Sequence, residues 1–170
     1  LVRPADNDDS VTVTMMRRVE AASLGKAKKV FDDYAQRMSV SDEGFELTCG
    51  SEDNDRPESI DRVVYRVSIP SSFNANVKLI SGDITIGELD GDVTADTGFG
   101  AIMIGHTTGN LKVVGRGGCI DLTEGCTGGA DVEGINADVY AANIGESSEF
   151  RLSGGNAWIG ECKGEIYAQT

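Results

Sequence analysis

The feature that most constrains this chain is a nine-residue repeat in its second half, first visible in GDITIGELDGDVTADTGFG (82–100). The repeat runs through five units without a slip, and its phase continues after one inserted residue near Cys126-Thr127. Eight of the ten units begin with glycine, and the exceptions are Ala137 and Glu146. The unit starts are residues 82, 91, 100, 109, 118, 128, 137, 146, 155 and 164. This period is too short for a helix with its connection, so each unit predicts one short strand and a tight corner.

Apolar residues occupy the second and fourth places after the unit start in nineteen of twenty cases. The exception is Ser148, where either the serine points inward or the strand slips by two places to use Phe150 and Leu152. Alternate residues of a strand face the same side, and glycine adopts the positive φ that a tight corner needs. Two units make a coil of 18 residues, so the predicted fold is mainly β, a two-sided parallel β-solenoid.

Residues 1–70 follow other rules, because they hold only three of the 22 glycines. The helical spacing of apolar residues predicts a helix over about 24–38, with Ser23 as its N-terminal cap. Strands are expected at 11–19, 45–49 and 61–69. The charged segment 50–61 is expected to be a solvated hairpin connection. We therefore predict that residues 1–70 form a small α/β segment that caps the first coil, and that residues 71–170 form the solenoid.

The order of these features resembles the putative-adhesin domain family. The features are an N-terminal strand, an amphipathic helix, further strands, a VSIP segment (67–70) and the GDITI and GDVTA rungs (82–95). The resemblance implies a β-solenoid of poorly defined function, found in bacterial envelopes and in some eukaryotic proteins. It implies no catalytic residues. The four cysteines depart from the usual cysteine-poor members, which counts against a cell-surface location.

The repeated Gly-Asp pairs suggest calcium ligands when they are taken alone. The calcium-binding β-roll requires Gly-Gly-x-Gly-x-Asp, with the aspartate two residues before an apolar one, and no unit carries that pattern. We expect side chains such as Asp83 and Asp92 to bond the turn backbone instead. The glycine cluster GRGG (115–118) is followed by neither Lys-Ser/Thr nor a helix, which excludes a phosphate loop. The sequence therefore predicts no metal and no cofactor.

Residues suited to catalysis are few and scattered. His106 is the sole histidine and falls in a turn, where no acidic partner can be placed beside it. Asp121 and Asp131 are expected on opposite faces, so they would not form an acid/base pair. Sugar-cleaving β-helical enzymes build clefts from longer coils and side loops, which nine-residue units do not provide. We predict that the chain is not an enzyme, with a carbohydrate-active enzyme as the most distant alternative.

The repeat also places the cysteines. Cys126 and Cys162 are 36 residues apart, which is two coils or roughly 9–10 Å along the rod, beyond the reach of a disulfide. Cys119 and Cys126 lie before and after one strand and point to different corners. With Cys49, the chain is expected to hold four isolated thiols.

The outward third place of each unit distinguishes the two faces of the solenoid. One face is flat, with small flanking residues, and carries Met103 and the pair Tyr140 and Trp158, which are expected to stack; the other face is charged. Exposed aromatic residues on a flat face favour an interface. The last coil, at GEIYAQT (164–170), is expected to expose core and strand edges. The predicted interface residues are Met103, Tyr140, Trp158, Ile166 and Tyr167.

Charge and composition limit the partners. The net charge of −13 argues against nucleic acid and anionic lipid. The sequence has no apolar run of eighteen residues, so no transmembrane segment is predicted. The first ten residues lack a methionine and an apolar core, so any targeting peptide is expected to have been removed. The expected partners are other protein subunits, or self-association at the open C-terminal coil, which another subunit, a second copy or further sequence would cover.

These observations lead to a predicted function and an alternative. The first is a non-catalytic structural or protein-interaction module, an accessory subunit docked in a larger assembly, with a mitochondrial one favoured over the envelope. The alternative is a cell-envelope adhesin or surface scaffold, as the family resemblance implies. An Arg-rich amphipathic leader in the precursor would favour the organelle, and an apolar signal would favour the envelope.

Overall fold

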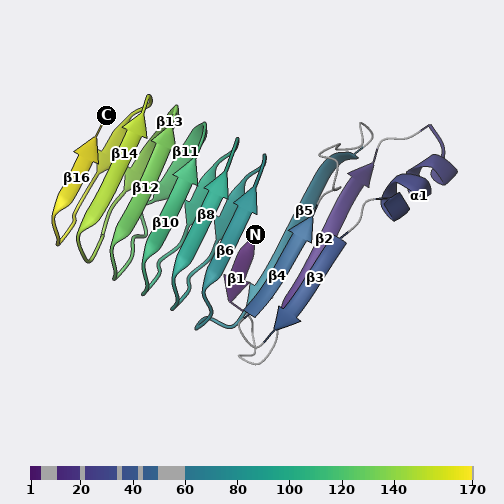
Figure 1. Ribbon diagram of the computed structural model, residues 1–170, viewed down its shortest axis with the longest axis horizontal. Coiled ribbons are helices and arrows are strands. Elements are labelled where there is room, and N and C mark those ends of the chain that lie inside the picture. The colour runs from purple at the N-terminus through teal and green to yellow at the C-terminus, as the bar shows by residue number, and fades with distance from the viewer. Residues whose placement is uncertain (5–10, 20–21, 34–35, 42–43, 50–59, 170) are drawn as a thin grey trace. The chain divides into compact units, whose positions relative to one another are not determined.

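The computed structural model describes residues 1–4, 11–19, 22–33, 36–41, 44–49 and 60–169 (Figure 1). The chain divides into two compact units. One unit comprises Leu1–Val13 and Arg66–Thr170, and the other comprises Thr14–Tyr65. The first unit therefore includes N-terminal residues that the sequence assigns to the cap.

The first unit is a parallel β-solenoid, as predicted, built from two sheets (Figure 1). In the first sheet, the strands lie in the order β1 (Val2–Pro4), β7 (Ile84–Ile86), β9 (Ile102–Ile104), β11 (Gly118–Leu122), β13 (Ala137–Ala141) and β15 (Ala157–Ile159). In the second sheet, they lie in the order β6 (Ala75–Leu79), β8 (Val93–Thr97), β10 (Leu111–Gly115), β12 (Ala130–Ile135), β14 (Ser148–Ser153) and β16 (Ile166–Gln169). The end of β5 (Ile60–Ile69) pairs in parallel with β1, on the side of β1 away from β7.

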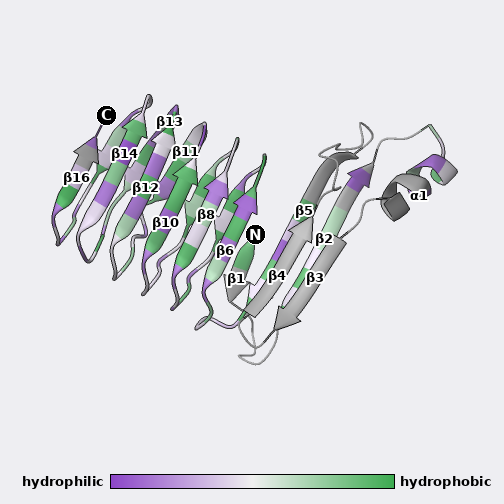
Figure 2. Ribbon diagram, in the orientation of Figure 1, coloured by the Kyte–Doolittle hydropathy of each residue, from purple (hydrophilic) through white to green (hydrophobic). Residues whose placement is uncertain are grey.

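Strand partners confirm the coil length that the repeat predicts. Ile84 pairs with Ile102, and Ile102 with Ile120, each 18 residues further along the chain. Inward residues at these places are buried almost completely. Figure 2 shows hydrophobic and hydrophilic residues alternating along the strands of the solenoid. The core is therefore a set of stacked columns in which each apolar residue packs on the equivalent residue of the next coil.

The inserted residue lies slightly before the place that the sequence suggests. Leu89 follows the end of its strand, Ile86, by three residues. Cys126, its equivalent in a later coil, follows Leu122 by four residues. The extra residue falls in a turn in which the Gly125 N–H donates to the Leu122 carbonyl at 3.1 Å, with Gly125 at φ +74°. Corner residues carry no apolar alternation, so the pattern alone could not locate the insertion.

The two-sided prediction misses a column of inward residues at one corner, all of them buried except the half-buried Cys162. After each first-sheet strand, a single residue bridges in parallel to its equivalent one coil on. The column comprises Leu89, Thr107, Cys126, Ile144 and Cys162, and we call it the corner column. At the other corner the last inward place of the second-sheet strands holds Thr97, Gly115, Gly134 and Leu152 in register. An added Cβ on Gly115 or Gly134 would meet Ile120 or Val139 across the core, so the coil is tight at this corner where those glycines stand.

The buried hydroxyl of Thr107, in the corner column, is a site where a substitution should stabilise the fold. Its side chain is fully buried, and its hydroxyl has no hydrogen-bond partner in the described part of the chain. Thr107→Val replaces that hydroxyl with a methyl group of similar size, so we expect the free energy of unfolding to rise by about 1 kcal/mol. Urea denaturation measures the change.

Thr97 is the matched control for this substitution. It is equally buried, but its hydroxyl donates to the Gly82 carbonyl at 3.0 Å. Thr97→Val should therefore lower the free energy of unfolding by about 1 kcal/mol. Equal effects of the two substitutions would contradict this account of the unpartnered hydroxyl.

Glycine has two different roles at the unit starts. At the starts that precede first-sheet strands, Gly82, Gly100, Gly118 and Gly155 have positive φ. Ala137 departs from this pattern, and Asn136 before it has φ 51°; Gly117 and Gly154, at the same place before Gly118 and Gly155, also have positive φ. The starts that precede second-sheet strands do not have positive φ; there an added Cβ would contact the neighbouring coil, as at Gly109, 2.5 Å from Asp92 Oδ1.

In the eighth unit the serine itself points inward, and the strand does not slip by two places. Ser148 points inward with 4% of its surface exposed, and β14 stays in register, since Asp131 pairs with Glu149. The Ser148 hydroxyl accepts the Ala130 N–H at 2.9 Å and donates to the Glu146 carbonyl at 3.2 Å. These bonds satisfy the one polar residue at the second or fourth place of a unit.

The second unit contains β2 (Thr12–Val19, from Thr14 on), α1 (Leu24–Asp33), β3 (Gln36–Ser41), β4 (Gly44–Cys49) and most of β5. Ser23 caps α1 as predicted, because its hydroxyl accepts the Lys26 N–H at 3.3 Å. The helix ends earlier than predicted, because Gln36–Ser41 pairs antiparallel with Gly44–Cys49. The apolar residues of 36–41 also fit period two, and the hairpin uses that pattern. Residues 50–59 of the charged connection lie outside the described residues.

Candidate interaction site

An outward column of side chains runs across the first sheet. Each member pairs in register with the next, from β7 to β15. The column comprises Thr85, Met103, Asp121, Tyr140 and Trp158, and we call it the outward column. Two of its large members, Met103 and Trp158, each expose 50% of their surface. The sequence-predicted residues Met103, Tyr140 and Trp158 thus share one face of one sheet.

Tyr140 and Trp158 form a stacked pair, as the sequence predicts. Their ring centroids are 4.5 Å apart and their planes differ by 2°. Neighbouring strands lie about 4.8 Å apart, so the sheet itself holds the two rings near stacking distance. The rings are therefore fixed in position by the backbone ladder rather than by a flexible loop.

A shallow hollow of about 520 Å³ adjoins the aromatic pair. It is lined by Thr123, Tyr140, Ala141, Ala157, Trp158, Ile159 and Gly160. The repeat assigns Ala157 and Ile159 to the core, yet the first is exposed and the second only half-buried. The repeat gives no signal for this, because it reports which way a residue points and not whether another coil covers it.

The second sheet presents a charged outer surface, as predicted. Asp96 forms ion pairs with Lys78 at 3.5 Å and with Arg116 at 2.6 Å. Arg151 pairs with Asp131 and with Glu149. These pairs lie at the surface, where solvent screening leaves an ion pair little net contribution to stability. The two faces therefore differ, one being aromatic with small flanking residues and the other ionic.

The remaining predicted interface residues, Ile166 and Tyr167, do not join the outward column. Both lie on β16 of the second sheet, with 43% and 62% of their surfaces exposed. The Tyr167 hydroxyl donates to Glu165, and this hydrogen bond raises the pKa of Tyr167. The structure thus separates the five predicted residues into a face and an end of the solenoid.

The acidic corner residues bond the backbone, as expected, but they reach across coils. Asp83, Asp92 and Asp138 accept the N–H groups of residues 18 positions later, at 2.9, 2.7 and 3.0 Å. Each carboxylate thereby satisfies a corner N–H of the next coil. No group of three or more possible metal ligands (His, Cys, Asp or Glu) occurs among the described residues.

The residues considered for catalysis are separated in the structure. His106 is exposed, and its Nδ1 lies 3.1 Å from the Glu124 carbonyl. Asp121 accepts the Thr123 hydroxyl at 2.7 Å on the first sheet, whereas Asp131 binds Arg151 on the second. The two carboxylates therefore belong to different sheets, as the repeat predicts.

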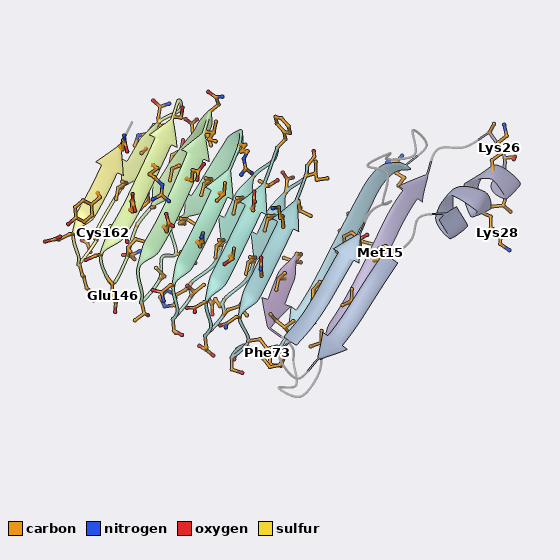
Figure 3. The ribbon with its side chains drawn as sticks, viewed as in Figure 1. Met15, Lys26, Lys28, Phe73, Glu146 and Cys162 are labelled. Atoms are coloured by element: carbon orange, nitrogen blue, oxygen red, sulfur yellow. The ribbon has the colours of Figure 1, made fainter. Side chains whose placement is uncertain are left out.

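The three described cysteines are unpaired. Cys126 and Cys162 occupy the corner column with Ile144 between them, which confirms their separation by two coils. Cys162 lies in the last coil, where it bridges to Ile144 of the coil before (Figure 3). Burial raises the pKa of all three thiols, and that of Cys126 to about 11. The side chain of Cys49 lies outside the described residues.

The raised pKa of Cys126 predicts a dependence of stability on pH. The folded state holds the thiol proton more tightly than the unfolded state, whose pKa is near 9.0. The resulting stabilisation is complete below about pH 9 and is lost as pH rises towards about 11. We expect the urea midpoint of Cys126→Thr, which cannot ionise, to fall less over this interval than that of the parent chain. Parallel pH profiles would contradict the prediction.

The residues that the structure describes include no helix long and apolar enough to cross a membrane. The resemblance to the putative-adhesin family stays a prediction. No protein-family model, curated protein or solved structure gives a significant match to this chain.

Proposed function

We propose that this chain is a non-catalytic protein-interaction module, an accessory subunit that docks into a larger assembly through the outward column. The observation that carries the proposal is the stacked pair Tyr140 and Trp158, with Trp158 half exposed on a flat sheet. Met103 extends the same surface two strands away. Tryptophan and tyrosine are the residues most often found at the energetic centre of protein interfaces.

Preorganisation supports this reading of the surface. The parallel ladder fixes both rings before any partner arrives, so little side-chain freedom remains to be lost on binding. The neighbouring residues are small: an added Cβ on Gly160 would lie 3.2 Å from the Cβ of Ala142. A partner can therefore approach the rings without displacing bulky side chains.

The cysteines support a reducing compartment for the assembly. Cys126 and Cys162 lie in separate coils of the corner column and cannot pair with one another. Buried, unpaired thiols persist where the surroundings keep thiols reduced. We place the assembly in an organelle, with the mitochondrion favoured.

Affinity capture with matched variants tests the proposal. The tagged chain would be expressed in its native cells, cross-linked and recovered, and its partners would be quantified by mass spectrometry. We expect Trp158→Ala and Met103→Ala each to reduce recovery of a defined partner. Lys112→Ala, at the equivalent outward place of the second sheet, should not. A hot-spot tryptophan contributes about 2 kcal/mol or more, roughly thirtyfold in affinity.

The outcome that would overturn the proposal is equal recovery with all three variants. Circular dichroism of the purified variants shows that each remains folded. Loss of the partner with Lys112→Ala alone would instead assign docking to the charged sheet and reject the outward column.

A further inference from the structure

Asp121 occupies the middle of the outward column, between Met103 and Tyr140. It pairs in register with Met103 on β9 and with Tyr140 on β13, so its position has a coil on both sides. Met103 is exposed, whereas Asp121 is half-buried. A short, charged side chain therefore lies between a long apolar one and an aromatic one.

The Asp121 carboxylate is held by one of its oxygens and has the other available for binding. Thr123 donates its N–H at 3.1 Å and its hydroxyl at 2.7 Å, both to Oδ1. The other oxygen, Oδ2, has no hydrogen-bond partner among the residues that the structure describes. The two bonds to Oδ1 restrict rotation of the carboxylate, so Oδ2 is an ordered acceptor for a charged donor.

The uncovered face of the Tyr140 ring is turned towards this carboxylate. Trp158 stacks on one face of the ring, with a centroid distance of 4.5 Å that is close to the spacing of about 4.8 Å between strands. The rings therefore stack along the direction that crosses the strands, and the other face of Tyr140 looks towards β11 and Asp121. An aromatic face beside a carboxylate attracts a cation through both groups.

The charges of the two sheets differ in a way that selects a basic partner. The repeat units that form β7, β9, β11 and β13 contain no lysine or arginine; they are residues 82–90, 100–108, 118–127 and 137–145. Their acidic residues are Asp83, Glu88, Asp90, Asp121, Glu124 and Asp138.

The units that form β8, β10, β12 and β14 contain basic residues of their own, namely Lys112, Arg116 and Arg151. There Arg116 pairs with Asp96, and Arg151 pairs with Asp131. The carboxylates of the second sheet are therefore partly neutralised within the chain, whereas no lysine or arginine of its own four units neutralises Asp121. A basic surface of another protein is attracted to the first sheet.

We propose that the outward column binds an arginine from a basic segment of its partner protein, at Asp121 and Tyr140. The inference rests on the docking surface proposed above and names the chemistry that this surface recognises. The planar guanidinium lies against the uncovered face of Tyr140 and donates N–H groups to Oδ2 of Asp121. Arginine suits this position better than lysine, because its planar group stacks on an aromatic ring while its N–H groups point outward in the same plane.

Titration with short peptides tests the recognition of arginine directly. The probes are acetyl-Gly-Gly-Arg-Gly-Gly-amide and the same peptide with lysine, added at low salt to the isotope-labelled chain and followed by NMR. We expect the arginine peptide to shift the amide signals of residues 121 and 140, and to bind about threefold more tightly than the lysine peptide. Asp121→Asn should weaken its binding about tenfold, because the amide oxygen still accepts from Thr123 but the charge is lost.

Glu133→Gln is the matched control for the loss of charge. Glu133 points outward on β12 of the second sheet, so this substitution removes the same charge from the other face and should leave peptide binding unchanged. Equal binding of the two peptides rejects the arginine site, as does an arginine peptide that does not bind. An affinity that Asp121→Asn leaves unchanged, or that Glu133→Gln lowers equally, also rejects it.

The capture experiment described above separates failure of this inference from failure of the docking surface. Asp121→Asn should reduce recovery of the same partner that Trp158→Ala loses. A partner lost with Trp158→Ala but fully recovered with Asp121→Asn keeps the outward column as the interface and rejects the arginine. Equal recovery with every variant rejects the docking surface, and the titration still decides whether Asp121 and Tyr140 bind arginine.

Discussion

Phe150→Ala is expected to lower the free energy of unfolding of the solenoid by about 3–5 kcal/mol. Phe150 is the largest fully buried side chain in the described part of the chain, and it lies inward on β14 between Val132 and Ala168 in the register. Its removal loses the transfer free energy of the ring and leaves a cavity that flanking strands cannot close, because the ladders on both sides hold their spacing. Urea denaturation followed by circular dichroism measures the loss.

Phe99→Ala is the matched control for this prediction. Phe99 exposes 70% of its surface at a corner, so its removal should change the free energy of unfolding by no more than about 0.5 kcal/mol. Trp158 is the sole tryptophan, and its fluorescence separates melting of the last coils from melting of the whole unit. A loss below about 1 kcal/mol for Phe150→Ala would contradict the buried position of the ring.

Gly100→Ala is expected to cost about 3 kcal/mol or more, which is large for the addition of one methyl group. Gly100 has φ +139°, and its new Cβ would lie 2.3 Å from the Gly82 carbonyl oxygen one coil earlier. The strained conformation costs about 1–3 kcal/mol, and relief of the collision requires the two coils to separate locally. Thermal and urea denaturation should both show the loss.

Gly82→Ala separates the two contributions. Gly82 has a similar φ of +128°, but the nearest atom to its added Cβ is Leu79 Cδ1 at 3.7 Å. This substitution should therefore cost only the backbone strain, about 1–3 kcal/mol. Equal costs at Gly82 and Gly100 would show that close stacking of the coils does not contribute.

The N-terminal half shows why local patterns give only part of a fold. Strands at 12–19, 44–49 and 60–69 match the expected ranges to within one residue, because strand-like alternation and bounding polar residues coincide there. The helix ends at Asp33 rather than near residue 38. Residues 36–41 fit both helical and strand periods, and pairing with 44–49 decides between them.

The sequence alone determined the coil, its inward residues and the face that carries the aromatic pair. A period of nine with glycine at its starts admits only short strands and corners, and alternation then fixes which side chains point inward. Stacking of Tyr140 on Trp158 follows from the same repeat, since residues 18 apart lie side by side on adjacent strands of one sheet. These properties depend only on spacing along the chain.

Tertiary structure alone decided what happens at the corners and at the end. The corner column, the turn that absorbs the inserted residue and the use of Asn136 in place of glycine all depend on contacts between coils. The repeat marks Ala157 and Ile166 as core, yet they lie open because burial requires a neighbour on both sides. The spacing of the repeat determines whether a side chain points inward. The packing of adjacent coils determines whether that side chain is buried.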